Sequence, residues 1–141
     1  MLSERQLAPS LYRRNGVMTN RQNREPTSFE PINLNFEKMN GLVPCILQHA
    51  YSGEVLMVGF MNEEAWTQTC ESGIFTIYRR TLGRVWKLNE DEEFFFHVVR
   101  IRVDCDDDTV ICETVPEHPV CGKGYYSCFY KEVPTKLKNP H

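Results

Sequence analysis

The pattern of hydrophobic and polar positions along the chain changes near residue 42. Residues 1–30 mix polar side chains with arginines and prolines and follow neither a helical nor a strand period, so we expect a flexible or loosely docked arm. From Leu42 onward, two apolar runs flank the polar turn Tyr51-Ser-Gly-Glu54, which predicts a β-hairpin. Residues 31–141 are expected to form one domain.

A single segment carries the signals of a helix. Asn62 is a suitable N-cap, two glutamates follow it in the expected first turn, and Gly73 marks the end. Short runs rich in β-branched and aromatic residues come next and are expected to be strands: IFTIYRR, RVWKL, EFFFHVVRIRVDC, DTVICETV and CFYKEV. The pattern predicts an α+β fold, with a mostly antiparallel sheet and one main helix.

Composition narrows the class of protein. The chain has 141 residues and a formal net charge of -3, which favours one compact domain and gives no overall field that would attract nucleic acid. No apolar run is long enough to cross a bilayer, and the first residues lack the apolar centre of a secretory signal. We therefore expect a cytoplasmic protein that binds neither nucleic acid nor a membrane.

Six cysteines in a reducing compartment favour metal ligation, catalysis or burial over disulfides. Cys121 and Cys128 stand on either side of a loop with two glycines, which lets both sulfurs face one ion, although their spacing is wider than in a zinc finger. Cys105, taken alone, is more typical of a buried residue than of a ligand. Core packing is the better interpretation for the remaining three, Cys45, Cys70 and Cys112.

Aspartates surround Cys105 in the segment Asp104-Cys-Asp-Asp-Asp108. If the preceding strand continues, Cys105 lies on one face, and the opposite face carries Asp104, Asp106 and Asp108. That placement predicts two separate sites, a thiolate site suited to zinc and a carboxylate site suited to magnesium. An alternative stays open, in which Arg100 and Arg102 simply pair with the aspartates at a solvated surface.

These residues together resemble the phosphoribosyl-AMP cyclohydrolase family of histidine biosynthesis, in the stretch from about Phe36 to Phe129. The matching pieces are Gly41–Gln48, Gly53–Asn62, Glu64-Ala-Trp66, Arg80-Thr81, Trp86, Asp104–Asp108, Pro119-Val-Cys121 and Ser127-Cys-Phe129, and the separations between Cys105, Cys121 and Cys128 are those of the family. The resemblance implies a homodimer with active sites at the interface. There Cys105 of one chain would join Cys121 and Cys128 of the other around Zn²⁺, and Mg²⁺ would be held by Asp104, Asp106 and Asp108.

The implied activity is that of a hydrolase acting on a cyclic amidine C–N bond. Attack of zinc-bound water would open the N1–C6 bond of phosphoribosyl-AMP or of a closely related purine nucleotide. The residues expected to bind this small-molecule substrate are Arg80, Thr81, Trp86, Tyr125 and Ser127. For Trp86, which lies in an expected strand, a place in the core is the alternative.

Two segments depart from the family pattern. Gly122-Lys123-Gly124 stands where the family has His-Thr-Gly, so the candidate catalytic residues become His118, as a replacement proton carrier, and Lys123. The phosphate-binding loop expected after the tryptophan reads Leu88-Asn-Glu-Asp-Glu-Glu93, whose carboxylates would repel a phosphate. The alternative is that this acidic run is a solvated turn that points away from the site. Two alternatives follow: a diverged paralogue with a different purine-like substrate, or a non-catalytic binding protein whose zinc only staples the dimer.

Overall fold

The computed structural model describes residues 31–137, and within the chain Asn35–His141 forms a compact unit. The arm expected over residues 1–30 lies outside the described residues. The elements of the unit, in chain order, are β1 (Val43–His49), β2 (Val55–Met61), α3 (Glu63–Ser72), β3 (Thr76–Arg79), β4 (Arg84–Lys87), the 3-10 turn η1 (Glu90–Glu92), β5 (Val98–Val103) and β6 (Val110–Thr114). The expected α+β class and the single main helix of the described residues are confirmed.

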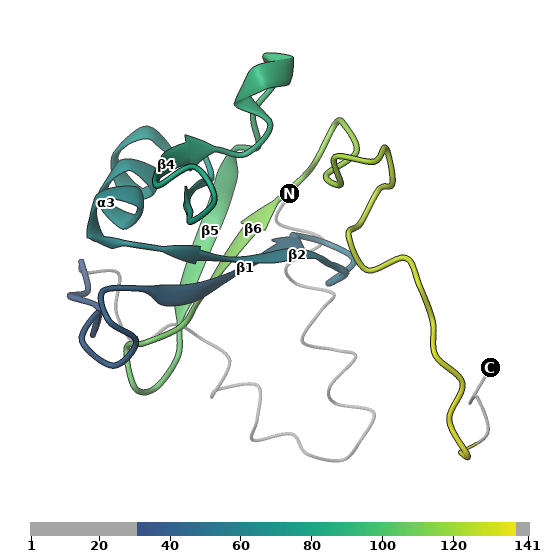
Figure 1. The fold of residues 1–141 in the computed structure, drawn as a ribbon, viewed down its shortest axis with the longest axis horizontal. Helices are drawn as coiled ribbons and strands as arrows, with labels where there is room; N and C mark the ends of the chain where they lie inside the picture. The colour runs from purple at the N-terminus through teal and green to yellow at the C-terminus, as the bar shows by residue number, and fades with distance from the viewer. Residues whose placement is uncertain (1–30, 138–141) are drawn as a thin grey trace. The chain divides into compact units, whose positions relative to one another are not determined.

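The main sheet has four strands in the order β2-β1-β6-β5, and β3 with β4 forms a separate two-stranded hairpin (Figure 1). Three ladders are antiparallel: β1 with β2, β5 with β6, and β3 with β4. The ladder between β1 and β6 is parallel, with Cys45 opposite Val110 and His49 opposite Thr114. The sheet is therefore mostly antiparallel, as expected, but its central pairing joins strands that lie far apart in the sequence.

The hairpin predicted from Leu42 onward is confirmed as β1 and β2. Pro44 of β1 lies at a position where no hydrogen bond to β6 is required from its backbone nitrogen. Pro44 faces Phe60 on β2, and the ladder to β6 begins only at the next residue. At Pro44 the strand has a neighbour on one side only, so this position behaves as a local edge.

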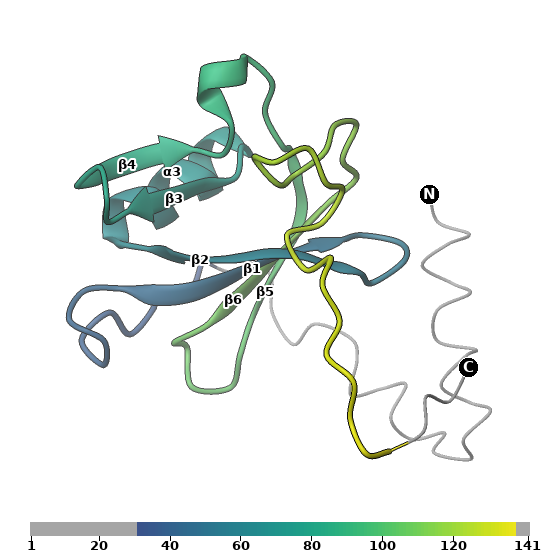
Figure 2. The same cartoon turned by 45° about the vertical axis from the view of Figure 1, so that its right-hand side comes forward.

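One face of the main sheet forms the core. Alternate residues of β1, namely Val43, Cys45 and Leu47, are fully buried, together with Val110 and Cys112 of β6. Helix α3 and the β3–β4 hairpin lie over one side of this sheet (Figure 2). Close approach is possible because a Cβ on Gly59 of β2 would already stand 3.6 Å from the Ile77 side chain of β3. This layer contacts the main sheet mainly through β2.

Helix α3 begins and ends as the sequence predicts. The Asn62 side-chain oxygen accepts the Ala65 N–H at 2.8 Å, which satisfies a donor that the first helical turn leaves unpaired. At the other end Gly73 has a φ of 74° and donates its N–H to the Thr69 carbonyl. The left-handed conformation at this position favours glycine.

Two sequence-based expectations are wrong. The segment CFYKEV is not a strand, because only Cys128 pairs with the sheet, through its N–H to the Leu56 carbonyl at 2.8 Å, after which the chain leaves the sheet. Cys70 is exposed on α3 and is not a core residue, in contrast to Cys45 and Cys112. An apolar run forms a strand only when a neighbouring strand can pair with it, and the local sequence does not show whether such a partner exists.

No helix of the described residues is both long and apolar enough to cross a membrane. The cytoplasmic location stays a prediction.

The cap of α3 offers a direct test of the fold. Replacing Asn62 by Ala is expected to lower the free energy of unfolding by about 1 kcal/mol, because the Ala65 N–H loses its acceptor. Asn62→Asp keeps an acceptor oxygen and is expected to stay within about 0.5 kcal/mol of the wild type. Urea denaturation followed by circular dichroism measures both variants. Equal stability of Asn62→Ala and the wild type would contradict the capping assignment.

Candidate functional site

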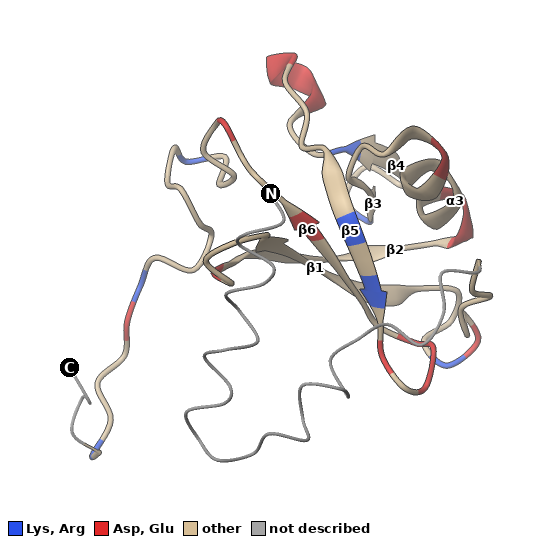
Figure 3. Cartoon of the chain, turned by 180° about the vertical axis from the view of Figure 1, so that it is seen from behind, with Lys and Arg blue, Asp and Glu red and all other residues tan. Residues whose placement is uncertain are grey.

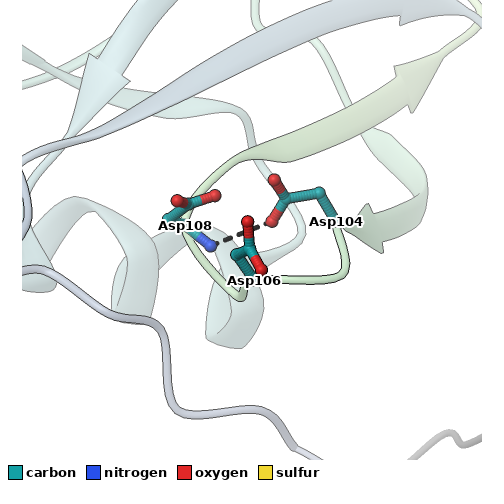
Figure 4. A group of neighbouring side chains, drawn as sticks. All are labelled: Asp104, Asp106 and Asp108. Atoms are coloured by element: carbon teal, nitrogen blue, oxygen red, sulfur yellow. Dashed lines mark hydrogen bonds between the residues drawn. The ribbon is translucent and has the colours of Figure 1, made fainter.

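The aspartates gather in the turn that joins β5 to β6. Strand β5 ends at Val103, and the chain closes a turn in which the Asp104 N–H donates to the Thr109 carbonyl and Asp107 has a φ of 59°. One Asp104 carboxylate oxygen accepts the N–H groups of Asp108 (3.0 Å) and Thr109 (3.3 Å). As Figure 4 shows, this turn brings three carboxylates together, and one oxygen of each lies within 4.8 Å of the others: Asp104, Asp106 and Asp108.

The reason for this gathering differs from the expected one. Alternation along a strand would place the aspartates and Cys105 on opposite faces only if β5 continued through residue 108. Strand β5 ends at Val103, so this argument does not apply. The turn brings the carboxylates together instead, and Cys105 is exposed within it. Clustered carboxylate oxygens are the donors that hard cations such as Mg²⁺ prefer, so the residues present fit the magnesium that the resemblance implies.

The alternative in which Arg100 and Arg102 pair with the aspartates is wrong. Both arginines instead bind Glu113 of β6, which is only 4% exposed. Arg100 holds both carboxylate oxygens, at 3.1 and 3.0 Å, and Arg102 approaches one of them at 3.0 Å. Figure 3 shows these basic positions on β5 beside the acidic position on β6.

Lys38, which the sequence pattern did not single out, is the cation that contacts the aspartates. Its ammonium lies 2.6 Å from an Asp108 oxygen and 4.0 Å from an Asp106 oxygen. The hydrogen bond from Lys38, followed by that involving Asp104, lowers the pKa of Asp108. Lysine and aspartate are 70 residues apart in the sequence, so no local pattern signals their contact.

The cysteine loop holds two thiols together at the opposite end of β6. The backbone closes the loop with hydrogen bonds from Cys121 N–H to the Tyr125 carbonyl and from Gly124 N–H to the Cys121 carbonyl, where Gly124 has a φ of 92°. Cys121 neighbours Cys128, and the Lys123 N–H points at the Cys121 sulfur at 3.4 Å.

The thiols of the loop differ from those of the core. Burial raises the pKa of Cys112 to about 12 and also raises that of Cys45, so both stay protonated and inert. Burial, followed by the neighbouring Cys121, raises the pKa of Cys128 as well. Two thiols in contact lose their protons together most easily when a cation lies between them, so this pair fits the implied zinc in its donor chemistry.

Cys105 is not brought to the other two cysteines within one chain. Among residues 31–137, the aspartates form the sole cluster of three or more metal-type side chains. Cys105 lies in the turn before β6, whereas the Cys128 N–H bonds to Leu56 at the start of β2, near the other end of β6. A strand of five residues spans about 13 Å, but sulfurs on one zinc are at most about 4.6 Å apart.

The acidic run lies beside the cysteine loop. Its η1 turn is tied to that loop because the buried Asn89 side chain donates to the Val120 carbonyl at 3.3 Å. The Glu90 carboxylate accepts hydrogen bonds from the Lys87 N–H and from the Arg84 side chain. These contacts lower the pKa of Glu90. The remaining acids are exposed: Asp91, Glu92 and Glu93. The run therefore keeps three solvent-facing carboxylates near the thiol pair.

The candidate proton carrier His118 is also near this loop. Its ring is exposed and stacks on Phe94, with centroids 3.8 Å apart and an angle of 21° between planes. Lys123 is exposed and touches the site through its backbone N–H. The catalytic roles of His118 and Lys123 stay predictions.

The expected substrate-binding residues fall into two groups. Arg80 and Thr81 are exposed in the turn between β3 and β4, and Arg80 lines a cavity of about 400 Å³ together with Asn40, Gly41, Leu42, Asn62 and Tyr78. Tyr125 is exposed and stacks on Tyr130 with centroids 3.7 Å apart. These three stay candidates for substrate contact.

The second group is interior. Trp86 is 8% exposed, and the Arg79 guanidinium lies 4.4 Å from its ring centroid, so the core alternative describes it. Ser127 is 5% exposed, and its hydroxyl donates to the Val55 carbonyl at 2.8 Å and accepts the Phe129 N–H at 2.9 Å. The Ser127 hydroxyl thus holds the chain around Cys128 against β2. A contact between Ser127 and the substrate stays a prediction.

The aspartate turn and the two loop cysteines lie at opposite ends of β6. The class is therefore a small α+β protein that has two groups of side chains suited to binding cations. The family model of phosphoribosyl-AMP cyclohydrolase matches residues 57–130, just over half of the chain, from β2 through the cysteine loop. The chain belongs to the phosphoribosyl-AMP cyclohydrolase family, so the resemblance seen in the sequence is confirmed.

Curated relatives agree with this assignment. The chain is 47% identical over 96 residues to the histidine biosynthesis bifunctional protein HisIE of Bacteroides thetaiotaomicron, covering 68% of this chain and 47% of the relative. It is 46% identical over 113 residues to HisIE of Escherichia coli K12, covering 80% and 52%. The corresponding protein of Salmonella typhimurium is 44% identical over 113 residues. The chain thus spans about half the length of the curated relatives it matches.

The anchoring role of Ser127 can be tested by truncation. Ser127→Ala is expected to lower the free energy of unfolding by about 1 to 2 kcal/mol, because the Phe129 N–H loses its acceptor in a buried place. Ser52→Ala removes a hydroxyl from an exposed turn and is expected to cost less than about 0.5 kcal/mol. Chemical denaturation compares the two. A Ser127→Ala variant as stable as Ser52→Ala would refute the anchoring role.

Proposed function

We propose that the chain catalyses the hydrolytic opening of the N1–C6 bond of phosphoribosyl-AMP in histidine biosynthesis. The observation that carries the proposal is the family match over residues 57–130, which includes the aspartate turn and both loop cysteines. Both elements retain local structures suited to their expected ligands: clustered carboxylates in one and paired thiols in the other.

The zinc ligands proposed are Cys105, Cys121 and Cys128, and the magnesium ligands are Asp104, Asp106 and Asp108. Zinc would supply an acidified water as the nucleophile, and magnesium would neutralise the negative charge of the substrate. Because Cys105 stands at the opposite end of β6 from the other two, we propose that it serves the thiol pair of a second copy. The active form is then a homodimer, with each zinc site shared between chains.

His118 is the residue proposed to carry protons. Stacking on Phe94 fixes the plane of its ring, while its exposure leaves the ring nitrogens accessible. Lys123 projects from the turn between the two cysteines and is proposed to meet an anionic group of the substrate or of the developing transition state. Arg80, at the cavity of about 400 Å³, is the proposed contact for a substrate phosphate.

A second candidate function is favoured by one specific observation. The Asn89–Val120 hydrogen bond keeps the acidic run next to the cysteine loop, where negative charge would oppose a phosphate. This placement supports a diverged paralogue that acts on a purine-like ring with its phosphate placed elsewhere. Turnover of phosphoribosyl-AMP distinguishes the two.

The zinc assignment is tested by serine substitution and by mixing. Cys105→Ser, Cys121→Ser and Cys128→Ser are each expected to lose most of their zinc, whereas Cys70→Ser, which changes an exposed cysteine, keeps it. Metal content is measured by mass spectrometry of purified protein. If Cys105→Ser retains full zinc, the three-cysteine assignment is wrong.

Mixing also tests the shared site. When Cys105→Ser and Cys121→Ser chains exchange subunits, half of the dimers are mixed and each has one complete site, so zinc returns to about one quarter of the wild-type level. A site contained in one chain would give no recovery.

The role of the acidic run is tested by charge removal. The protein loaded with zinc and magnesium is incubated with phosphoribosyl-AMP, and the ultraviolet change of the ring-opened product is followed. In the triple variant Asp91→Asn, Glu92→Gln and Glu93→Gln, KM is expected to fall about three- to tenfold with kcat within twofold, because repulsion acts on binding common to ground and transition states. Glu90 is left unchanged because it supports the turn.

The matched control removes three exposed charges from α3: Glu63→Gln, Glu64→Gln and Glu71→Gln. It is expected to leave KM unchanged. Efficient wild-type turnover with the same KM in both triple variants would mean that the run does not affect substrate binding. No turnover of phosphoribosyl-AMP by any of the three proteins would favour the altered substrate.

A further inference from the structure

Lys38 contacts two carboxylates of the aspartate turn. Its ammonium makes a 2.6 Å hydrogen bond to one oxygen of Asp108 and stands 4.0 Å from an oxygen of Asp106, so it bridges two of the three carboxylates. The lysine side chain is 51% exposed and that of Asp108 is 19% exposed, so the contact lies at the rim of the turn. In the described residues, Lys38 is the sole basic side chain within 4.0 Å of these aspartates.

An ammonium in this place competes directly with a metal ion. Magnesium requires oxygen ligands at about 2.0 to 2.1 Å in octahedral geometry, and a hydrogen-bonded lysine uses a lone pair of the Asp108 oxygen. The lysine charge also opposes a dication at such short range. Lys38 therefore has to withdraw if the ion is to take the Asp108 oxygen that the lysine holds.

The surrounding backbone allows this withdrawal without disturbing the aspartates. The Asn35 N–H donates to the Asp107 carbonyl at 2.7 Å, and the Gly41 N–H donates to the Phe36 carbonyl at 2.6 Å. These bonds hold the segment on both sides of Lys38 independently of its side chain. The lysine can swing into solvent by rotation of its own bonds while the turn keeps its place.

We propose that Lys38 is the resident counter-ion of the aspartate turn and that it sets the magnesium affinity by having to be displaced. In the metal-free protein it offsets the mutual repulsion of three carboxylates and keeps them gathered. On binding, the metal takes over that task and releases the lysine into solvent. This inference rests on the proposed magnesium site and adds to it a residue that controls its affinity.

The sign of the effect separates this role from a structural one. Removing the lysine charge raises the energy of the metal-free turn, which abolishes the competition and tightens binding. Because the pair is partly exposed, the expected gain is modest, about two- to fivefold in Mg²⁺ affinity for Lys38→Met. A residue that only supported the fold would lower the affinity when replaced.

Isothermal titration of the 141-residue chain with MgCl₂ is the first measurement. Lys38→Met is expected to bind Mg²⁺ about two- to fivefold more tightly than the wild type, and Lys38→Arg, which keeps the charge, to stay within twofold. Lys87→Met makes the same charge change on β4 and is expected to stay within twofold. Equal or weaker binding by Lys38→Met overturns the inference alone, because the magnesium site would still be present.

Chemical labelling provides the second measurement. Acetic anhydride is expected to modify Lys38 more rapidly when Mg²⁺ is saturating, as followed by mass spectrometry of peptides, while Lys87 labelling is unchanged. Labelling of Lys38 that does not respond to Mg²⁺ overturns the displacement. Absence of Mg²⁺ binding in both the wild type and Lys38→Met would overturn the proposed magnesium site together with this inference, whereas binding by Lys38→Met alone would support the competition.

Discussion

The parallel ladder between β1 and β6 is the constraint on which the placement of both donor sets depends. It fixes β6 in the middle of the sheet, with β5 on its other side. The aspartate turn leads into β6, and the cysteine loop leaves from its far end (Figure 1). A paired strand is too stiff to bend its two ends together, so carboxylates and thiols are kept apart. One chain therefore offers two separate donor sets of different chemistry.

Glu113 supports this division through its own ion pairs. A carboxylate that is 4% exposed needs compensation, and two arginines from β5 provide it, one of them with two hydrogen bonds. The same contacts hold β5 beside β6 where Arg100 and Glu113 face each other in the ladder. They also keep both guanidinium groups away from the aspartates. The carboxylate turn is left with one lysine as its cationic contact among the described residues.

Elements governed by local chemistry were predictable from the sequence. The Asn62 cap, the Gly73 stop and the first hairpin each depend on residues within a few positions of one another. The paired thiols and the cluster of aspartates were also expected. The aspartates come together because the chain turns after β5, and not because of strand alternation. The partners of Arg100 and Lys38 were missed, because a choice between Glu113 and the aspartates is made by strand pairing across long separations. The strand predicted for the segment CFYKEV was wrong for the same reason, because no other strand pairs with this segment.

The central ladder also has a consequence for how the molecule folds. It joins residues 45–49 with residues 110–114, and the chain between them contains the helix and the β3–β4 hairpin, which are built from near neighbours. Local elements form quickly, whereas closing a segment of this length has an entropic cost that slows the pairing. The aspartate turn and the cysteine loop are each closed by hydrogen bonds between near neighbours, so both can form before β6 docks beside β1. The separation between these two groups of side chains is therefore set late in folding, when the slow central pairing is made.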